Sequence, residues 1–486
     1  MNIVLVMPPY KITEQFGMPY PVGLGYIGTV LKTNGYNVRI IDCDAMKIGH
    51  KELRDILLME KPDVVGVTAT SYTRFSAIKV VNMAKSILPD TCIIVGGPHF
   101  TATAEDALTV VKNIDFMVRG EGENTILELL AALKNKTDLG QIDGLSFRRD
   151  GKIIHNKNRQ PIKGLDLIPM LDRDLVPNGK YFEKLPYSNI ECKSILASRG
   201  CPFNCAFCFL HEREYRRRSN SGILDEAEYL IDRYKINAIR FFDLTFTLLE
   251  TNVEDFCHQI KKRKLNFLWY CESRVDIDYN LLEIMKDAGC YSIDFALESA
   301  SKKVLKQVNK KIVPEQALAF AKKCKELGIK TKVFLMLSLP GEEKYDAEET
   351  YNFACELSKY VSAFGLQVTQ IIPGTEVEYR AKALGLLNKD FSWNSPYKSI
   401  KSKIFADTDI VPLYIEKLSF EEIADLYRKY SVFDIYNFEK ISLNSLKRKL
   451  WKGLTNWDKG LVFKLKWLII FIKVWFMRIF KKPHKK

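Results

Sequence analysis

Apolar runs of three to five residues alternate with longer amphipathic segments along residues 1–140 of the 486-residue chain. Short buried strands that alternate with helices are typical of a doubly wound parallel sheet. The expected strands are residues 3–7, 38–41, 64–68, 93–95 and 116–118. Sheets of this kind bind ligands at the carboxyl ends of their strands. The loops that follow these strands are therefore the first candidate site.

The same alternation resumes after residue 190. Its expected strands are residues 194–197, 238–242, 268–271, 291–296, 331–337 and 365–369. Six strand-helix units fit an open partial barrel better than a closed one of eight, and functional residues again follow the strands. Between the two regions, residues 144–155 predict a hairpin with Asp150-Gly151 at its turn, followed by a linker with spaced prolines. We therefore expect units at 1–140, 141–190 and 191–385, a helical region at 386–440 and a tail at 441–486.

Three cysteines, Cys201, Cys205 and Cys208, stand on the loop that leaves the strand expected at 194–197. Thiolates are the ligands of iron-sulfur clusters, and a four-iron cluster that only carries electrons takes four of them. Three thiolates leave one iron open to a substrate or cofactor, as in a catalytic metal site. A structural zinc site is the alternative, although zinc fingers usually pair C-x2-C with a second, distant pair. The pattern favours a cluster with an open iron.

The spacing C-x3-C-x2-C, with Gly200-Cys201-Pro202 at its start and Phe207 before the last cysteine, resembles the signature of radical S-adenosylmethionine (radical SAM) enzymes. In that family, the amino and carboxylate groups of SAM chelate the open iron. The resemblance implies a [4Fe-4S] cluster on the three cysteines, a partial barrel, and SAM contacts from residues after its strands. These are Phe207, Asp243, Arg274 and Glu298. For Asp243, as for Thr245 and Gln370, an ordinary solvated loop residue is the alternative, and many relatives carry a second acid where Leu244 stands.

The loops after the first five strands carry glycines and hydroxyls, which allow a bulky ligand to approach the backbone and bind its polar parts. A dinucleotide fold is the rival interpretation, but the first turn lacks G-x-G-x-x-G. The order Pro-Pro, G-x-G-Y, G-G-P-H and R-G-E-G-E resembles the Rossmann-like cobalamin-binding domain of cobalamin-dependent radical SAM enzymes. The cobalamin contacts that it implies are Thr68, Ser71, Gly96, Gly97, Pro98, His99, Glu121 and Gly122. There is no Asp-x-His-x-x-Gly motif, so His99 is expected to be a contact or a hydrogen-bonding loop residue, not a ligand of cobalt.

The resemblance implies an enzyme that uses a [4Fe-4S] cluster, SAM and cobalamin to functionalise, most simply to methylate, an unactivated carbon. It also implies an electron donor such as flavodoxin or ferredoxin. Some family members cyclise or rearrange rings instead, and this reaction is one alternative. A radical SAM enzyme with a degenerate first domain is a second alternative, and a non-catalytic carrier of the cluster or of cobalamin is a third.

The net charge of +14 by itself would favour a protein that binds nucleic acid, but the positive charge is concentrated in one segment. Residues 441–486 hold thirteen Lys or Arg and one acid, so the rest of the chain is nearly neutral. Residues 461–480 are apolar and rich in aromatic rings, but four basic residues interrupt them. We expect this tail to lie on an anionic membrane surface and not to bind nucleic acid, with packing on the protein itself as the alternative. Without a signal peptide, the expected location is the cytoplasm, at the inner face of the membrane, with a small-molecule or lipid substrate.

Overall fold

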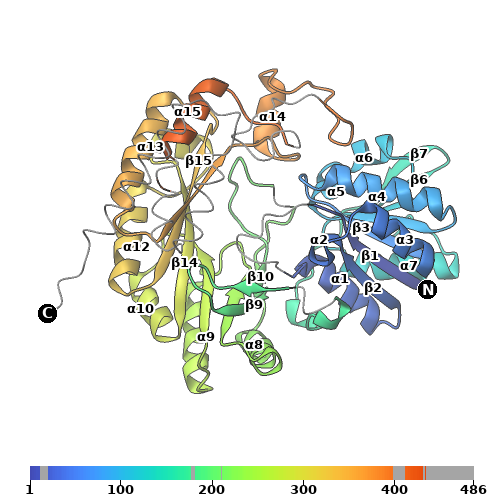
Figure 1. The fold of residues 1–486 in the computed structure, drawn as a ribbon, viewed down its shortest axis with the longest axis horizontal. Coiled ribbons are helices and arrows are strands. Elements are labelled where there is room, and N and C mark those ends of the chain that lie inside the picture. The colour runs from blue at the N-terminus through green and yellow to red at the C-terminus, as the bar shows by residue number, and fades with distance from the viewer. Residues whose placement is uncertain (11–19, 177–180, 210, 398–410, 431–432, 434–486) are drawn as a thin grey trace.

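The computed structural model describes residues 1–10, 20–176, 181–209, 211–397, 411–430 and 433. The first half of the molecule is built on a sheet of seven strands in the order β2-β1-β3-β4-β5-β6-β7 (Figure 1). Its strands are β1 (Asn2–Met7), β2 (Asn37–Asp42), β3 (Val64–Thr68), β4 (Cys92–Gly96), β5 (Phe116–Val118), β6 (Leu145–Arg149) and β7 (Lys152–His155). The first five are parallel and confirm the strands expected from the sequence. The predicted hairpin also forms, as β6 and β7, and extends this sheet in antiparallel pairing.

Two apolar cores cover the two faces of this sheet. Alternate side chains of β1 enter different cores, Ile3 and Leu5 one and Val4 and Val6 the other, as the two-residue period of a strand requires. The helices that complete the cores are α1 (Val22–Thr33), α2 (Cys43–Met46), α3 (His50–Glu60), α4 (Arg74–Ile87), α5 (Pro98–Ala102), α6 (Ala104–Val110) and α7 (Glu123–Asn135). Because β1 to β5 are parallel, their carboxyl ends lie at the same edge of the sheet.

The segment between the halves is extended, as its prolines predict, but it packs closely on both. It contains two short 3-10 helices, Leu165–Leu167 and Arg173–Leu175, and the strand β8 (Glu183–Lys184). Glu183 accepts hydrogen bonds from the Tyr20 amide of the first half and the Ser194 amide of the second, at 3.2 and 2.7 Å. Tyr181 donates to Asp42 at the end of β2.

The second half is built on a curled sheet in the order β16-β15-β14-β13-β12-β9-β8. Its parallel strands are β9 (Glu191–Ile195), β12 (Ala238–Phe241), β13 (Leu268–Ser273), β14 (Cys290–Glu298), β15 (Lys330–Leu337) and β16 (Ala363–Val368). Neighbouring strands follow chain order, which confirms a partial barrel of six strand-helix units. One apolar core joins the strands to the helices on the outer side (Figure 1). These helices are α8 (Asn220–Tyr234), α9 (Glu250–Lys262), α10 (Tyr279–Asp287), α12 (Pro314–Glu326) and α13 (Lys344–Leu357). The short helix α11 (Lys302–Gln307) contributes Val304 to a separate apolar cluster.

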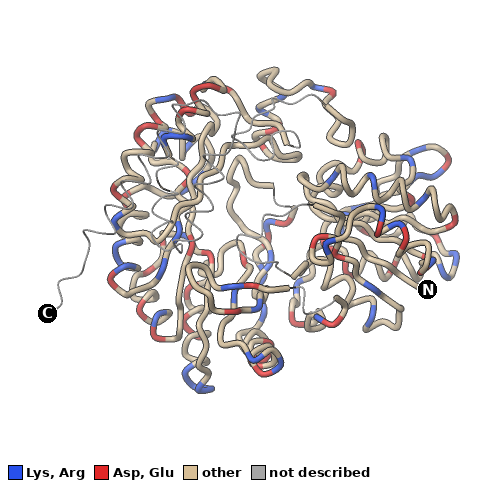
Figure 2. Tube along the Cα trace, viewed as in Figure 1, with Lys and Arg blue, Asp and Glu red and all other residues tan. Residues whose placement is uncertain are grey.

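Two further helices follow the sixth strand, α14 (Glu376–Ala383) and α15 (Phe420–Tyr430). The tail predicted at 441–486 lies outside the described residues. Among the helices that the structure describes, none combines the length and the apolar character needed to cross a membrane. Figure 2 shows acidic and basic residues interspersed over both halves, in keeping with the nearly neutral charge calculated for the chain before the tail.

Candidate functional site

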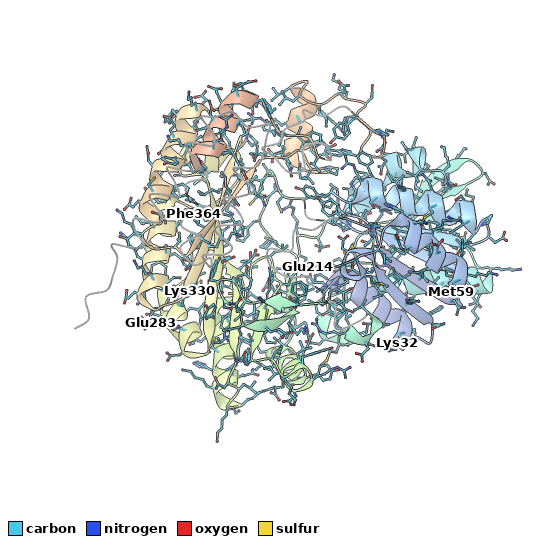
Figure 3. All side chains as sticks on the ribbon, in the orientation of Figure 1. Lys32, Met59, Glu214, Glu283, Lys330 and Phe364 are labelled. Atoms are coloured by element: carbon cyan, nitrogen blue, oxygen red, sulfur yellow. The ribbon has the colours of Figure 1, made fainter. Side chains whose placement is uncertain are left out.

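The loop of the three cysteines is closed by a short antiparallel ribbon. Its strands are β10 (Ser198–Arg199) and β11 (Arg216–Arg217), and Arg199 pairs with Arg216. Gly200 follows β10 with φ +83°, and a Cβ there would lie 2.1 Å from the carbonyl oxygen of Glu214. No other residue fits, so the glycine of the motif is required by the ribbon. Figure 3 shows Glu214 between the two halves of the chain.

The middle of the loop is anchored to the barrel. Ala206 is buried; its amide donates to the Val308 carbonyl at 3.0 Å, and its carbonyl accepts from the Val377 amide at 3.1 Å. Phe207 packs against the apolar cluster that contains Ala206, Val308 and Val377. The three thiols influence one another: burial, and then the thiols of Cys205 and Cys201, raise the pKa of Cys208 to about 11.

The donor set fits a cluster. In the described part of the chain, no group of three or more His, Cys, Asp or Glu side chains is placed so that it could hold a single metal ion. Three thiolates are the donor set of an iron-sulfur cluster, in which each thiolate binds its own iron. Lys310 faces the thiol of Cys205, where its charge opposes the rise of the pKa that burial causes.

Arg274 and Glu298, two of the predicted SAM contacts, lie close to the cysteines. The Arg274 guanidinium lies 3.9 Å over the ring of Phe203 and is held by Asp276 at 2.8 Å. Glu298 has φ +67° at an irregularity between β14 and β15, and pairs with Lys310 at 3.2 Å. A positive φ in a residue other than glycine is costly and is common at functional sites. The sequence motifs did not indicate this backbone geometry.

Asp243 is turned toward the strand that leads into the cysteine loop. Its carboxylate accepts hydrogen bonds from the Ala197 amide, at 3.2 Å, and from the Ser198 hydroxyl. Burial raises the pKa of Asp243 to about 6. Asp243 therefore supports the start of the loop, and its direct contact with a cofactor stays a prediction.

In the first half, the loops after β3 and β4 pack closely on each other. Gly97 has φ +90°, and a Cβ would lie 2.5 Å from the hydroxyl of Thr68. The Ala69 amide donates to the Gly96 carbonyl, and the His99 amide to the Ala69 carbonyl. Pro98 begins α5 directly after this contact. The glycine pair thus brings Thr68, Ser71 and His99 to one place at the edge of the sheet.

His99 is buried and uses both ring nitrogens. Nδ1 lies 3.2 Å from the Ser71 hydroxyl and Nε2 lies 3.3 Å from Oδ1 of Asn394. Burial, and then the nearby charge of Arg74, lowers the pKa of His99 to about 3, so the ring is neutral. Arg74 is buried too and donates to the carbonyls of Ser71 and Trp393. The sequence analysis did not single out Arg74 or Asn394, and no local signal marks a contact between residues so distant in the chain.

The R-G-E-G-E loop after β5 binds the cysteine ribbon. Arg216 donates to both carboxylate oxygens of Glu121, at 2.8 and 3.0 Å, and Arg199 donates to Glu123 at 2.7 Å. Burial alone would raise the pKa of Glu121, but the hydrogen bonds from Arg216 and the Ile162 amide lower it. Gly122 precedes α7, which begins at Glu123.

Two glycines bring the rest of the cysteine loop against both halves. A Cβ on Gly120, in the loop after β5, would lie 2.6 Å from the ring of His211. A Cβ on Gly374 would lie 2.8 Å from the ring of Phe209 and 3.6 Å from Ala102 of the first half. The cysteine loop therefore lies between the strand ends of the barrel and the ligand-binding edge of the first sheet.

The chain matches the Radical SAM superfamily over residues 195–354 and the B12 binding domain over residues 14–130. It is 33% identical over 395 residues to an uncharacterised methyltransferase of Pyrococcus horikoshii, with 80% of this chain and 84% of that protein covered. It is 30% identical over 370 residues to an anaerobic magnesium-protoporphyrin IX monomethyl ester cyclase of Rubrivivax gelatinosus, covering 73% of this chain and 65% of the cyclase. Among solved structures, its fold is similar to TsrM of Kitasatospora setae, a radical SAM methyltransferase with cobalamin and a [4Fe-4S] cluster bound. That likeness has a TM-score of 0.71 at 17% identity, with 98% of this chain and 100% of TsrM covered.

The chain belongs to the family of cobalamin-binding radical SAM enzymes. Its cofactors are a [4Fe-4S] cluster, SAM and cobalamin. The prediction of a cobalamin domain followed by a partial radical SAM barrel is confirmed. The alternatives of a degenerate first domain and of a non-catalytic carrier are not favoured.

Proposed function

We propose that the enzyme transfers a methyl group from SAM to an unactivated carbon of a small molecule. The observation that carries this proposal is the position of the cysteine loop. It contacts Gly120 on the cobalamin side and Val308 and Val377 on the barrel side. The P. horikoshii relative, which is a methyltransferase by name, supports methyl transfer. Ring cyclisation stays the weaker candidate, because the chain spans only 65% of the cyclase relative.

Each group of residues has a separate task in this proposal. Cys201, Cys205 and Cys208 hold the cluster, and Phe207, Arg274, Glu298 and Asp243 surround SAM. The loops with Thr68, Ser71, Gly96 to His99, Glu121 and Gly122 border cobalamin. When bound, the three cofactors supply reductive radical chemistry and methyl transfer. The protein orients them and excludes water, and the bond between Glu298 and Lys310 keeps a carboxylate next to the cysteines.

Replacement of one cysteine ligand tests the proposal. The enzyme is reconstituted anaerobically with iron and sulfide and reduced, and release of 5'-deoxyadenosine from SAM is measured. Cys205→Ala should lower this release to background, because the cluster loses one of its three ligands. Cys355→Ala is the matched control, since Cys355 is an exposed cysteine on α13, and it should keep wild-type activity. A wild-type protein that binds zinc and leaves SAM intact would contradict the proposal.

The proposal also includes a substrate that has lipid-like parts. Phe242 and Leu244, at the end of β12, are 48% and 54% exposed, and exposed apolar side chains beside a site favour an apolar ligand. The tail at 441–486, with its expected anionic membrane surface, agrees with such a substrate. Anaerobic incubation with methyl-labelled SAM and a cell lipid extract should label a lipid fraction. Label confined to water-soluble products would exclude a lipid substrate.

The proposal also includes a flavodoxin or ferredoxin as the electron donor.

A further inference from the structure

The ribbon that closes the cysteine loop carries two arginines directly opposite each other. Arg199 on β10 pairs with Arg216 on β11, and each strand is only two residues long. Like charges at such a cross-strand position repel, which destabilises so short a ribbon. The acids that neutralise them come from neither strand. They are Glu121, on the loop after β5, and Glu123, at the start of α7.

The four side chains, Glu121, Glu123, Arg199 and Arg216, form what we call the charged junction. They are nearly buried, with 4% of the Arg216 side chain and 7% of the Glu123 side chain exposed. The pair between Arg216 and Glu121 is bidentate, at 2.8 and 3.0 Å, and bidentate pairs fix orientation as well as distance. Arg199 links the two acids, at 2.7 Å from Glu123 and 3.4 Å from Glu121. The junction therefore sets both the position and the rotation of the ribbon on the first half.

The carboxylate of Glu121 is fully engaged in this contact. Besides the two arginines, it accepts a hydrogen bond from the Ile162 amide at 2.9 Å, and Arg216 donates to the carbonyl of the same residue at 2.7 Å. Cys201 follows Arg199 after one glycine, so movement of the ribbon moves the first cysteine. Through this contact, Glu121 acts on the cluster by way of the loop.

We propose that Glu121 and Glu123 are positioning residues, which hold the iron-sulfur loop at a fixed distance from the cobalamin site. The inference rests on the proposed function, because it takes the cluster to sit on the three cysteines. Chemistry that joins groups held by two domains depends strongly on their separation, and a shift of about 1 Å can cost a hundredfold in rate. The charged junction keeps that separation constant.

The test compares Glu121→Gln with wild type in the holoenzyme, loaded with the reduced cluster and cob(II)alamin. Pulsed electron paramagnetic resonance measures the distribution of distances between the two paramagnetic centres. Wild type should give one narrow distribution and Glu121→Gln a broader one. Amide hydrogen exchange of residues 200–208 should also rise roughly tenfold in the variant, because charge-assisted hydrogen bonds that protect the loop are lost.

The matched control is Glu128→Gln. Glu128 lies on the same helix, α7, and also pairs with an arginine, Arg159, but its side chain is 47% exposed. It should keep the wild-type distribution. If Glu121→Gln lowers the melting temperature yet keeps the wild-type width, the residue only stabilises the fold and the proposal is wrong.

A milder variant covers the case in which Glu121→Gln does not fold. Glu123→Gln weakens one charge-assisted hydrogen bond, that to Arg199, and should also broaden the distribution of distances between the two paramagnetic centres. A wild-type protein that shows no cluster signal would instead refute the proposed function, so the two failures are distinguishable.

Discussion

Among the described residues, two of the places where the halves of the chain meet differ in chemistry. The charged junction pairs two acids with two arginines around the base of the cysteine loop. The second, which we call the neutral junction, consists of Ser71, His99 and Asn394 with the buried Arg74. There, Arg74 donates to backbone carbonyls and lies 4.1 Å over the ring of Phe75.

The difference shows what each junction is suited to do. Charge-assisted bidentate bonds are strong and directional, so they suit a ribbon whose orientation matters for the cluster. At the neutral junction, the cation Arg74 is met by backbone carbonyls and an aromatic ring instead of by a bidentate carboxylate, so the contacts there are less directional. The neutral junction seals the segment around Trp393 against the first half.

The largest effect is expected when one side of the charged junction is removed. Arg216→Ala should lower the free energy of unfolding by about 3–5 kcal/mol, because it removes the bidentate partner of the nearly buried Glu121 and leaves only the longer contact to Arg199, at 3.4 Å. Urea denaturation measures this loss. The control is Arg149→Ala, whose pair with Asp138 is exposed on both sides and should be worth less than about 1 kcal/mol. Equal losses in the two variants would mean that the charged junction is not stabilising.

A smaller loss is expected when the neutral junction is broken. Asn394 donates to Asp106 at 2.8 Å and contacts His99 through its carbonyl oxygen. Asn394→Ala should cost about 1–3 kcal/mol, since it leaves buried polar groups without partners. The same denaturation assay measures it. A loss as large as that of Arg216→Ala would contradict the ranking of the two junctions.

The smallest effect near neutral pH is a difference in response to acid, because a fall from pH 7 to pH 6 only begins to charge the unfolded imidazole of His99. The folded pKa of His99 is about 3, and its unfolded pKa is about 6.5. Its contribution to stability is therefore complete above pH 6.5 and falls by up to about 1.4 kcal/mol per pH unit as the pH drops toward 3. Glu121 has a lowered pKa, so the charged junction keeps its contribution until the pH falls below the ordinary range of a glutamate.

Unfolding measured at pH 7, 6 and 5 tests this prediction in wild type and His99→Gln. The wild type should lose stability faster than the variant over this range, because only the wild type has an imidazole at position 99 that binds a proton on unfolding. Asp243 opposes this trend in both proteins, since burial raises its pKa to about 6 and favours the folded state as the pH falls. Identical slopes would show that His99 does not titrate as described.

Local patterns were sufficient for most of the fold. The buried runs of β1 to β5 and the strands β12 to β16 lie where their period and length predict, because both properties are read from neighbouring residues. The first barrel strand, β9, begins three residues before the predicted 194–197. The cysteine motif identified the cluster loop for the same reason, since its ligands are seven positions apart at most. The hairpin was also predicted, but its addition to the first sheet was not, because pairing between β5 and β6 depends on tertiary contact.

The sequence by itself determined the two kinds of sheet, their order, the cysteine loop and the cofactors that its motifs imply. Only the tertiary structure decided what Glu121, His99 and Asp243 contact. Arg216 lies 95 positions from Glu121, and Asn394 lies 295 positions from His99. A carboxylate or an imidazole in a loop can bind a cofactor or another side chain equally well, and the choice depends on which partner the fold brings within hydrogen-bond distance.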